Sequence, residues 1–289
     1  MTAATSALTF FRRQLRTGGS SVRAAHDKAY LKSSLRFWGA DLPAIRVAVR
    51  EYCRAHPDLT RAELRAIAEA LYETDVHELR ASAIGVLECN RERLVDRDLP
   101  WLIELVRRSD SWAYVDLLAP KVIGNVIARD VRSRRRLVKW AKDESFWVRR
   151  AALLAEHDAL RAGRGDFALW ARLAAGMLAE REFFIRKAIG WVLREVSKKR
   201  PALTYAFLGE HRKRVSNLSL QEGAKYLSAA QRKALGLPGK APWIAREARR
   251  KAVNRVRDDP KWVCAAKTAC ARLMQRLPYG SRSSAGQVS

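Results

Sequence analysis

The chain has 289 residues, of which 48% are hydrophobic and 30% are charged. This composition excludes an intrinsically disordered protein, and the length allows one large domain or two small ones with a sizeable core. No stretch approaches the ~20 consecutive apolar residues that a membrane-spanning helix needs, so we expect no membrane partner.

The charge balance is strongly basic. Lys and Arg total 56, Asp and Glu total 30, and the formal net charge is +26. Such an excess repels itself in the compact state and usually persists because a polyanion neutralises it. A nucleic acid is therefore the leading candidate partner, ahead of an anionic membrane or an acidic protein. The alternative is an Arg-rich composition that only aids solubility.

Cysteines and histidines give no sign of a metal site. The four cysteines, Cys53, Cys89, Cys264 and Cys270, are scattered without a Cys-x-x-Cys pair, and the five histidines show no His-x3-His spacing. No Gly-rich phosphate-binding loop is present. We therefore expect no metal, no cofactor and no disulfide framework, and a reducing compartment, with a bacterial cytoplasm as the default.

The first 16 residues predict a helix. Their lack of acids and their Ser and Arg content would also suit a mitochondrial transit peptide. Leu8, Phe11 and Leu15, however, fall on one helical face, and such a face is typical of a helix that packs against a core. We favour the structural helix.

The remainder to residue 237 predicts further helices, because apolar residues recur with helical periodicity and no long alternating pattern occurs. Thr60 with Glu63 suits a helix start, as does Asp98-Leu-Pro100. Helix breaks are expected at short intervals: Gly39 to Pro43, Pro57 to Thr60, Thr74 to His77, Asp98 to Pro100, Pro120, Gly163 to Asp166, and Pro201.

An internal repeat organises these helices. Its members are LRASAIGVLE (79–88), the degenerate WAYVDLLAP (112–120), FWVRRAALLAE (146–156) and FIRKAIGWVLRE (184–195). Aligning Arg80, Val115, Arg149 and Arg186 gives steps of 35, 34 and 37 residues. This period is typical of HEAT or TPR helix pairs, which bury their apolar faces only against neighbouring repeats. The sequence therefore predicts an all-α fold, a curved solenoid of HEAT-like helical repeats.

The register also predicts a functional surface. The residues that follow the aligned positions are Ala81, Asp116, Arg150 and Lys187, which should line up along one side of the stack. Trp112 lies four residues before Asp116 and Trp191 four after Lys187, so each shares a helical face with its charged neighbour. A carboxylate between indole faces suits a cationic ligand, and the cations suit phosphates.

The last segment differs in character from the repeats. Residues 238–289 carry 12 Lys or Arg and three Asp or Glu, and they end in SRSSAGQVS. We expect two domains, a repeat domain at 1–237 and a basic helical or disordered C-terminal extension at 238–289 that contacts phosphates. A membrane-surface or partner-binding helix is the alternative for this extension.

Several of these segments resemble one known family. FFIRKAIGWVLREVSKKRPALTYAFL, SWAYVDLLAP, FWVRRAALL and AYLKSSLRFWGADLPAIR are similar to stretches of AlkD-type alkylpurine DNA glycosylases, of the HEAT-like repeat DNA glycosylase superfamily. The resemblance spans roughly residues 8 to 230, and GWVLRE together with Trp-x3-Asp is its most specific part. It implies hydrolysis of the N-glycosidic bond of N3- or N7-alkylated purines in double-stranded DNA, without metal or cofactor.

The resemblance also implies roles for single residues. Asp116 would be the catalytic carboxylate, with Trp112 and Trp191 around the lesion nucleotide. Arg150 would contact the DNA backbone, and Tyr30 would lie near the site. To the DNA-binding surface we further assign Lys187, Arg149, Arg186 and two members of the basic run RSRRR, Arg134 and Arg135.

Each residue has a plainer alternative. Tryptophans at helical spacing usually belong to a core, Asp116 can be an ion-pair partner of Arg150, and a Schiff-base role for Lys187 would need desolvation. For the whole chain, the rivals to a monomeric, nucleoid-associated glycosylase are a non-catalytic HEAT-repeat protein that binds DNA or RNA, and a protein-interaction scaffold. Loss of affinity with salt would separate the phosphate binders from the scaffold.

Overall fold

The protein is helical throughout the part that its structure describes. The computed structural model describes residues 2–239, and in that range there is no strand, only an isolated bridge between Arg36 and Val76. The expected all-α fold is confirmed. None of the helices in this range is both long and apolar enough to cross a bilayer. The expected basic extension lies outside the described residues, except for positions 238 and 239.

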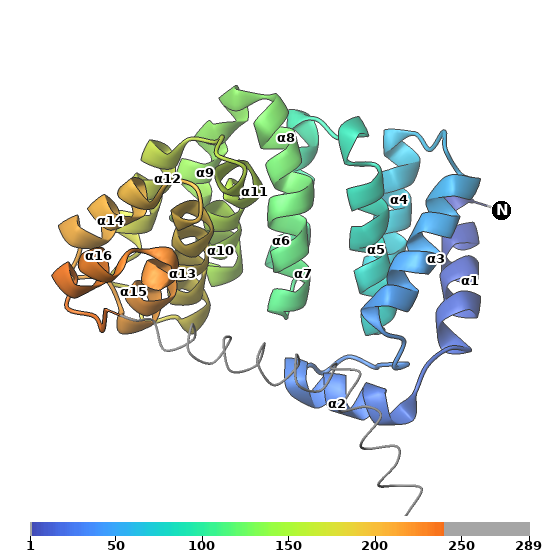
Figure 1. Ribbon diagram of the computed structural model, residues 1–289. Coiled ribbons are helices and arrows are strands. Elements are labelled where there is room, and N and C mark those ends of the chain that lie inside the picture. Colours follow the sequence, from blue (N-terminus) through green and yellow to red (C-terminus); the bar gives the residue numbers. More distant parts are fainter. Residues whose placement is uncertain (1, 240–289) are drawn as a thin grey trace, which may run out of the picture. The chain divides into compact units, whose positions relative to one another are not determined.

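The helices stand side by side in a bent row (Figure 1). The first half comprises α1 Ala3–Arg16, α2 Ser21–Leu31, α3 Leu42–Ala55, α4 Arg61–Tyr72, α5 His77–Cys89, α6 Leu99–Arg107, α7 Trp112–Leu117 and α8 Gly124–Arg129. The second comprises α9 Arg135–Trp140, α10 Phe146–Leu154, α11 His157–Arg161, α12 Phe167–Gly176, α13 Phe183–Ser197, α14 Pro201–Glu210, α15 Asn217–Gly223 and α16 Ala229–Ala234. The predicted repeat segments fall on α5, α7, α10 and α13.

In three of the four copies of the repeat, the aligned residue is an arginine that makes the same hydrogen bond. Each donates to the carbonyl oxygen of the residue six positions earlier: Arg80 to Thr74 (2.9 Å), Arg149 to Asp143 (2.6 Å) and Arg186 to Glu180 (2.8 Å). Each arginine thereby satisfies a backbone carbonyl in the turn that leads into its helix. The recurrence of arginine in the pattern is explained by this bond.

Both predicted helix starts are present, and the first has a side-chain cap. The amide of Glu63 donates to Thr60 Oγ1 at 3.2 Å, and the amide of Thr60 donates to Glu63 Oε2 at 2.8 Å, which is a complete capping box for α4. Pro100 lies in the first turn of α6, where its missing N–H costs no hydrogen bond. Both starts are confirmed.

The break expected at Pro120 is wrong. The helix that begins with α7 continues through a π-helical segment, Leu118–Ile123, directly into α8. Proline cannot donate to the carbonyl one turn earlier, and its ring crowds that carbonyl. A π turn accommodates both effects because it is wider than an α turn and shifts the hydrogen-bond ladder by one residue. The segment begins two residues after Asp116.

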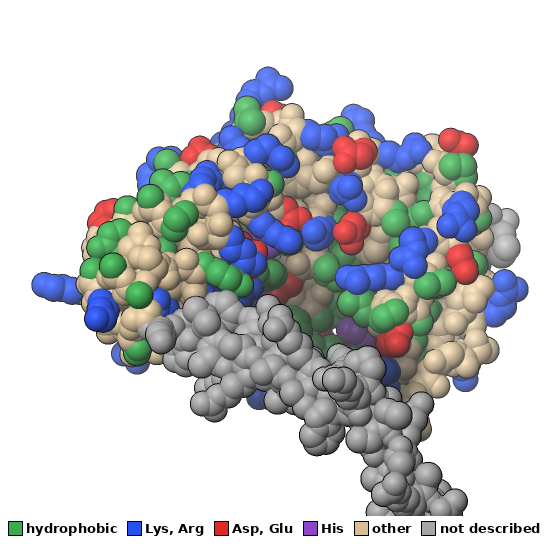
Figure 2. Space-filling model, in the orientation of Figure 1, with side chains coloured by type: hydrophobic (Ala, Val, Ile, Leu, Met, Phe, Trp, Pro, Cys, Tyr) green, Lys and Arg blue, Asp and Glu red, His purple; other side chains and the backbone are tan. Residues whose placement is uncertain are grey.

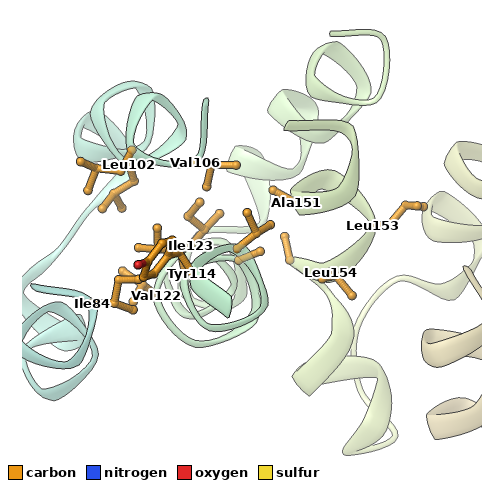
Figure 3. Packing of buried hydrophobic residues seen from close by; sticks show 14 of the residues in the cluster. Ile84, Leu102, Val106, Tyr114, Val122, Ile123, Ala151, Leu153 and Leu154 are labelled. Carbon is orange, nitrogen blue, oxygen red and sulfur yellow. The ribbon is translucent and has the colours of Figure 1, made fainter. Parts of the chain in front are cut away.

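The core runs between the helices as one continuous cluster. Ile84 of α5, Leu102 of α6 and Tyr114 of α7 are almost fully buried and meet between their helices (Figure 3). At the N-terminal end, α1 buries Phe11 and Leu15, as predicted for the first helix, and also Ala7, whereas the predicted Leu8 is only partly buried.

Helix α2 is held differently from all its neighbours. It has no buried residue, so no hydrophobic face fixes it. Its anchor is Gly39, whose carbonyl accepts from the Ser20 amide at 3.2 Å and whose own amide donates to Glu78 Oε1 at 2.7 Å. Gly39 has φ +82°, and a Cβ there would lie 2.0 Å from the Ser20 carbonyl oxygen. Only glycine fits at this position.

Gly39→Ala should therefore loosen α2. The left-handed backbone costs alanine about 1–2 kcal/mol and the contact with Ser20 adds to that, so amides of α2 should exchange at least about tenfold faster. Hydrogen-exchange mass spectrometry on peptides from 21–31 measures this effect. Gly18→Ala is the matched control because a Cβ there meets open space. Equal exchange in α2 of the two variants would contradict this account of the anchor.

Candidate active site

The charged positions of the repeat meet in one cleft, as the register predicts. Asp116 on α7, Arg150 on α10 and Lys187 on α13 line a cleft of about 730 Å³. Ala81 is not among its lining residues and instead packs, half-buried, against the core. Successive helices of the stack therefore supply one carboxylate and two cations to the same opening.

Arg150 holds Asp116 in a two-point contact. Its Nε and Nη2 donate to Oδ1 and Oδ2 of Asp116, both at 2.8 Å, and its Nη1 donates to the carbonyl of Phe184. The guanidinium carbon lies 5.7 Å from the centre of the Phe184 ring. This planar pairing fixes both the position and the rotation of the carboxylate.

The two partners differ in exposure. The side chain of Arg150 is 3% exposed, whereas that of Asp116 is 17% exposed and so reaches the cleft. We expected Arg150 to contact the DNA backbone. In this structure its three nitrogens bind Asp116 and Phe184 and its side chain is buried, so Arg150 fixes the orientation of Asp116. Its contact with DNA stays a prediction. The alternative of an Asp116–Arg150 ion pair is what the structure shows.

Aromatic rings form much of the cleft wall. Those among the lining residues are Tyr30, Trp112, Trp147, Phe183, Phe184 and Trp191. Tyr30, exposed at the end of α2, meets the Trp112 ring edge-on at a centroid distance of 5.9 Å. Trp147 packs against Phe184 at 4.9 Å. Such a wall offers several ring faces to a flat or cationic ligand.

Trp147, Phe183 and Phe184 were not expected from the sequence, although the register contains a signal for them. Aromatic residues stand four positions before each of the three charged residues: Trp112, Phe146 and Phe183. Trp147 and Phe184 stand three positions before Arg150 and Lys187. Residues three or four apart share a helical face, so an aromatic wall follows from the same alignment.

Trp191 is backed by a buried histidine. The rings of Trp191 and His157 lie 4.6 Å apart, and His157 is 5% exposed. His157 Nδ1 is 3.0 Å from Asp158 Oδ1, and Lys121 Nζ donates to Asp158 Oδ2 at 2.7 Å. A polar network thus holds the histidine that packs against the indole, and His157 is not among the residues that line the cleft.

Asp158 makes this support pH-dependent. The hydrogen bond from His157, with help from Lys121, lowers the pKa of Asp158 to about 2, below the ordinary 3.8. Because the folded-state pKa is lowered, the stabilisation is complete above about pH 4 and disappears as the pH falls through 2. Asp158→Asn should cost about 1 kcal/mol at pH 7, after allowance for solvent screening, and nearly nothing at pH 2. Urea unfolding at both pH values measures this, with exposed Asp58→Asn as the control. A constant difference between the pH values would refute the assignment.

Comparison with known proteins assigns the chain to a family. The sequence model of the family described as "DNA alkylation repair enzyme" matches residues 11–227, close to the 8–230 expected from the resemblance. This chain belongs to that family. Among curated proteins, none matches.

Solved structures give the same result for this DNA alkylation repair enzyme. A protein from Enterococcus faecalis, described as a predicted DNA alkylation repair enzyme, is 26% identical with a TM-score of 0.66, covering 72% of this chain and 96% of that one. AlkD2 from Streptococcus mutans is 17% identical with a TM-score of 0.51, covering 70% and 96%. The protein smu.31 of Streptococcus mutans UA159 is 18% identical with a TM-score of 0.51, covering 65% and 93%. The last two show a shared fold.

The remaining expected DNA-binding residues of this repair enzyme lie outside the cleft. Arg149 binds Glu180 through Nε and Nη2, at 3.0 and 2.8 Å, besides its backbone carbonyls. Arg134 pairs with the buried Glu156 at 2.7 Å. Arg135 is exposed and lines a different hollow. Arg149, Arg186 and Arg134 are thus engaged in contacts within the chain, which the charge pattern alone does not reveal.

Positive charge is nevertheless abundant on the surface of the enzyme. Lys and Arg side chains appear over much of the visible surface in Figure 2, with fewer acids among them. At the cleft itself, Lys187 is 40% exposed and 3.6 Å from Glu222, and Lys32 is exposed. Lys187 is not desolvated, so its surroundings do not favour Schiff-base chemistry. Among residues 2–239, no three His, Cys, Asp or Glu side chains are grouped to hold a metal ion.

Proposed function

We propose that this enzyme is a monofunctional DNA glycosylase that hydrolyses the N-glycosidic bond of N3- or N7-alkylated purines in double-stranded DNA. The observation that supports this most directly is Asp116, a carboxylate held at two points by a buried arginine and open to an aromatic cleft. We further propose that it works as a monomer on bacterial DNA, without metal or cofactor.

The chemistry of the lesion explains why one carboxylate suffices. Alkylation at N7 or N3 gives the base a positive charge, so the base leaves as a neutral molecule and needs no general acid. As the bond to C1′ breaks, positive charge develops on the sugar. A carboxylate fixed beside that atom stabilises the charge, as in glycosidases, and orients the attacking water.

The geometry of Asp116 suits this role. A carboxylate offers four lone pairs and Arg150 uses two of them, so two remain for water and for the sugar. Because Arg150 already fixes the group, no reorganisation is needed when charge develops. Trp112 and Trp191 supply ring faces to a cationic nucleotide, and Lys187 and Lys32 supply positive charge for its phosphates.

The test is base release from duplex DNA that contains N7-methylguanine. We expect the full chain to release the modified base and to leave unmodified duplex intact. No release, with tight binding that weakens steeply with salt, would instead identify a non-catalytic DNA-binding protein.

Salt dependence of binding separates DNA binding from a scaffold role. If six or more phosphates are contacted, affinity should fall roughly a thousandfold between 50 and 200 mM salt. Fluorescence anisotropy with a labelled duplex measures this change. Weak binding that hardly responds to salt would favour the scaffold.

A further inference from the structure

Two free thiols lie on neighbouring helices that do not line the cleft. Cys53 is a half-buried residue of α3, and Cys89 is the exposed last residue of α5. Neither α3 nor α5 contributes a residue to the cleft. The pair therefore has no part in the proposed glycosylase chemistry, and an inference about these thiols does not depend on the proposed function.

The packing of α3 on α5 brings these thiols together. A Cβ on Gly85 of α5 would lie 2.8 Å from Val49 Cγ2 of α3, so the two helices are in very close contact there. Cys89 and Cys53 each lie four residues, about one turn, beyond this contact. The Asn90 side chain, just after α5, donates to Cys53 Sγ at 3.6 Å. The end of α5 is thus beside Cys53.

The surroundings favour a thiolate at Cys89. Hydrogen bonding from the Cys53 thiol and the positive charges of Arg91 and Arg50 lower the pKa of Cys89, while burial and Glu88 oppose the effect. The pKa of Cys89 is lowered to about 7, and the same hydrogen bond together with burial raises the pKa of Cys53. The lowered pKa favours Cys89 over Cys53 as the nucleophilic thiol of the pair.

We propose that Cys89 is an oxidant-reactive thiol and that Cys53 resolves it, so that a hydroperoxide converts the pair into an intramolecular disulfide between α3 and α5. The Cys89 thiolate attacks one oxygen of hydrogen peroxide, the O–O bond breaks, and hydroxide leaves. Cys89 is then a sulfenic acid. The Cys53 sulfur attacks the Cys89 sulfur, and the hydroxyl leaves as water with the Cys53 proton. Two electrons pass from the two thiols to the peroxide.

The experiment uses the full chain with Cys264→Ser and Cys270→Ser, so that Cys53 and Cys89 are the remaining thiols. The protein is treated with hydrogen peroxide, and free thiols, intact mass and linked peptides are measured. We expect loss of both thiols, a mass lower by two hydrogen atoms, and a peptide that joins positions 53 and 89. Retention of both thiols, or a disulfide between two chains on a non-reducing gel, would overturn the proposal.

Single variants in that background assign the roles. Cys53→Ser, or Cys53→Ala if the serine variant folds poorly, should stop at a sulfenic acid on Cys89 that dimedone traps. Cys89→Ser should react at least about tenfold more slowly, because Cys53 is half-buried and protonated. If the two single variants react with hydrogen peroxide at equal rates, the assignment of Cys89 as the reactive thiol and Cys53 as the resolving thiol is wrong. Circular dichroism checks that each variant is folded.

Discussion

The Asp116→Asn variant should release N7-methylguanine about 100- to 1,000-fold more slowly than the wild type, because a single well-placed electrostatic group contributes that much to a rate. Asparagine keeps the shape of the side chain but removes the charge that stabilises the sugar. In the wild type, Arg150 donates to both carboxylate oxygens of Asp116 at 2.8 Å, so the NH2 group of asparagine would place a donor opposite one of these donors. Binding to DNA should persist, since removing a negative charge does not weaken phosphate contacts.

Single-turnover kinetics with enzyme in excess isolates the chemical step. The matched control is Asp110→Asn, which removes another carboxylate from the same cleft. Asp110 is 38% exposed and 3.8 Å from Arg80, so it lacks the fixed geometry of Asp116. We expect little change in rate there. Similar rates for wild type and Asp116→Asn would remove Asp116 from the mechanism.

Arg150→Met should be among the most damaging changes to stability. It removes the partner of Asp116 and leaves the Phe184 carbonyl without its donor. Breaking a buried ion pair in this way costs about 3 kcal/mol, which for a domain of this size lowers the Tm by roughly 6–12 °C. Base release should fall as well, because the carboxylate loses its fixed orientation. Arg150→Lys should recover part of the stability but not the two-point contact.

Thermal unfolding followed by circular dichroism measures the loss. The control is Arg132→Met, an arginine whose side chain is 86% exposed and pairs with Asp130 at the surface. Exposed pairs contribute little, so its Tm should change by less than about 2 °C. If Arg150→Met and Arg132→Met are equally stable, the buried pair does not organise the site as described.

Sequence alone predicts those features of this protein that recur in every repeat. Apolar periodicity predicts the helices. The alignment of Arg80, Val115, Arg149 and Arg186 predicts their spacing and the shared surface of Asp116, Arg150 and Lys187. A periodic stack turns equal positions in the repeat into neighbouring positions in space, so register is enough. The family match over residues 11–227 confirms the resemblance drawn from the same segments.

What the pattern does not predict depends on contacts between side chains. Arg149 and Arg150 are adjacent in sequence, yet Arg149 binds Glu180 while Arg150 binds Asp116. Both are positive charges in the sequence, so composition and charge pattern cannot distinguish their partners. The position of Tyr30 also could not be predicted from the sequence pattern, because α2 has no buried face and hence no apolar periodicity. Only the family resemblance suggested that Tyr30 lies near the site. The roles of these residues remain predictions until the variants above are measured.

The π-helical segment Leu118–Ile123 sets a limit on how this chain can tolerate length changes. A π turn corresponds to one extra residue in an α-helix. Deleting Pro120 would remove both the extra residue and the proline, restore a regular helix and rotate Trp112–Leu117 by about 100° relative to α8. The core contacts of α8 could survive, while Asp116 would turn away from Arg150. A deletion that leaves the helix intact would thus abolish the site.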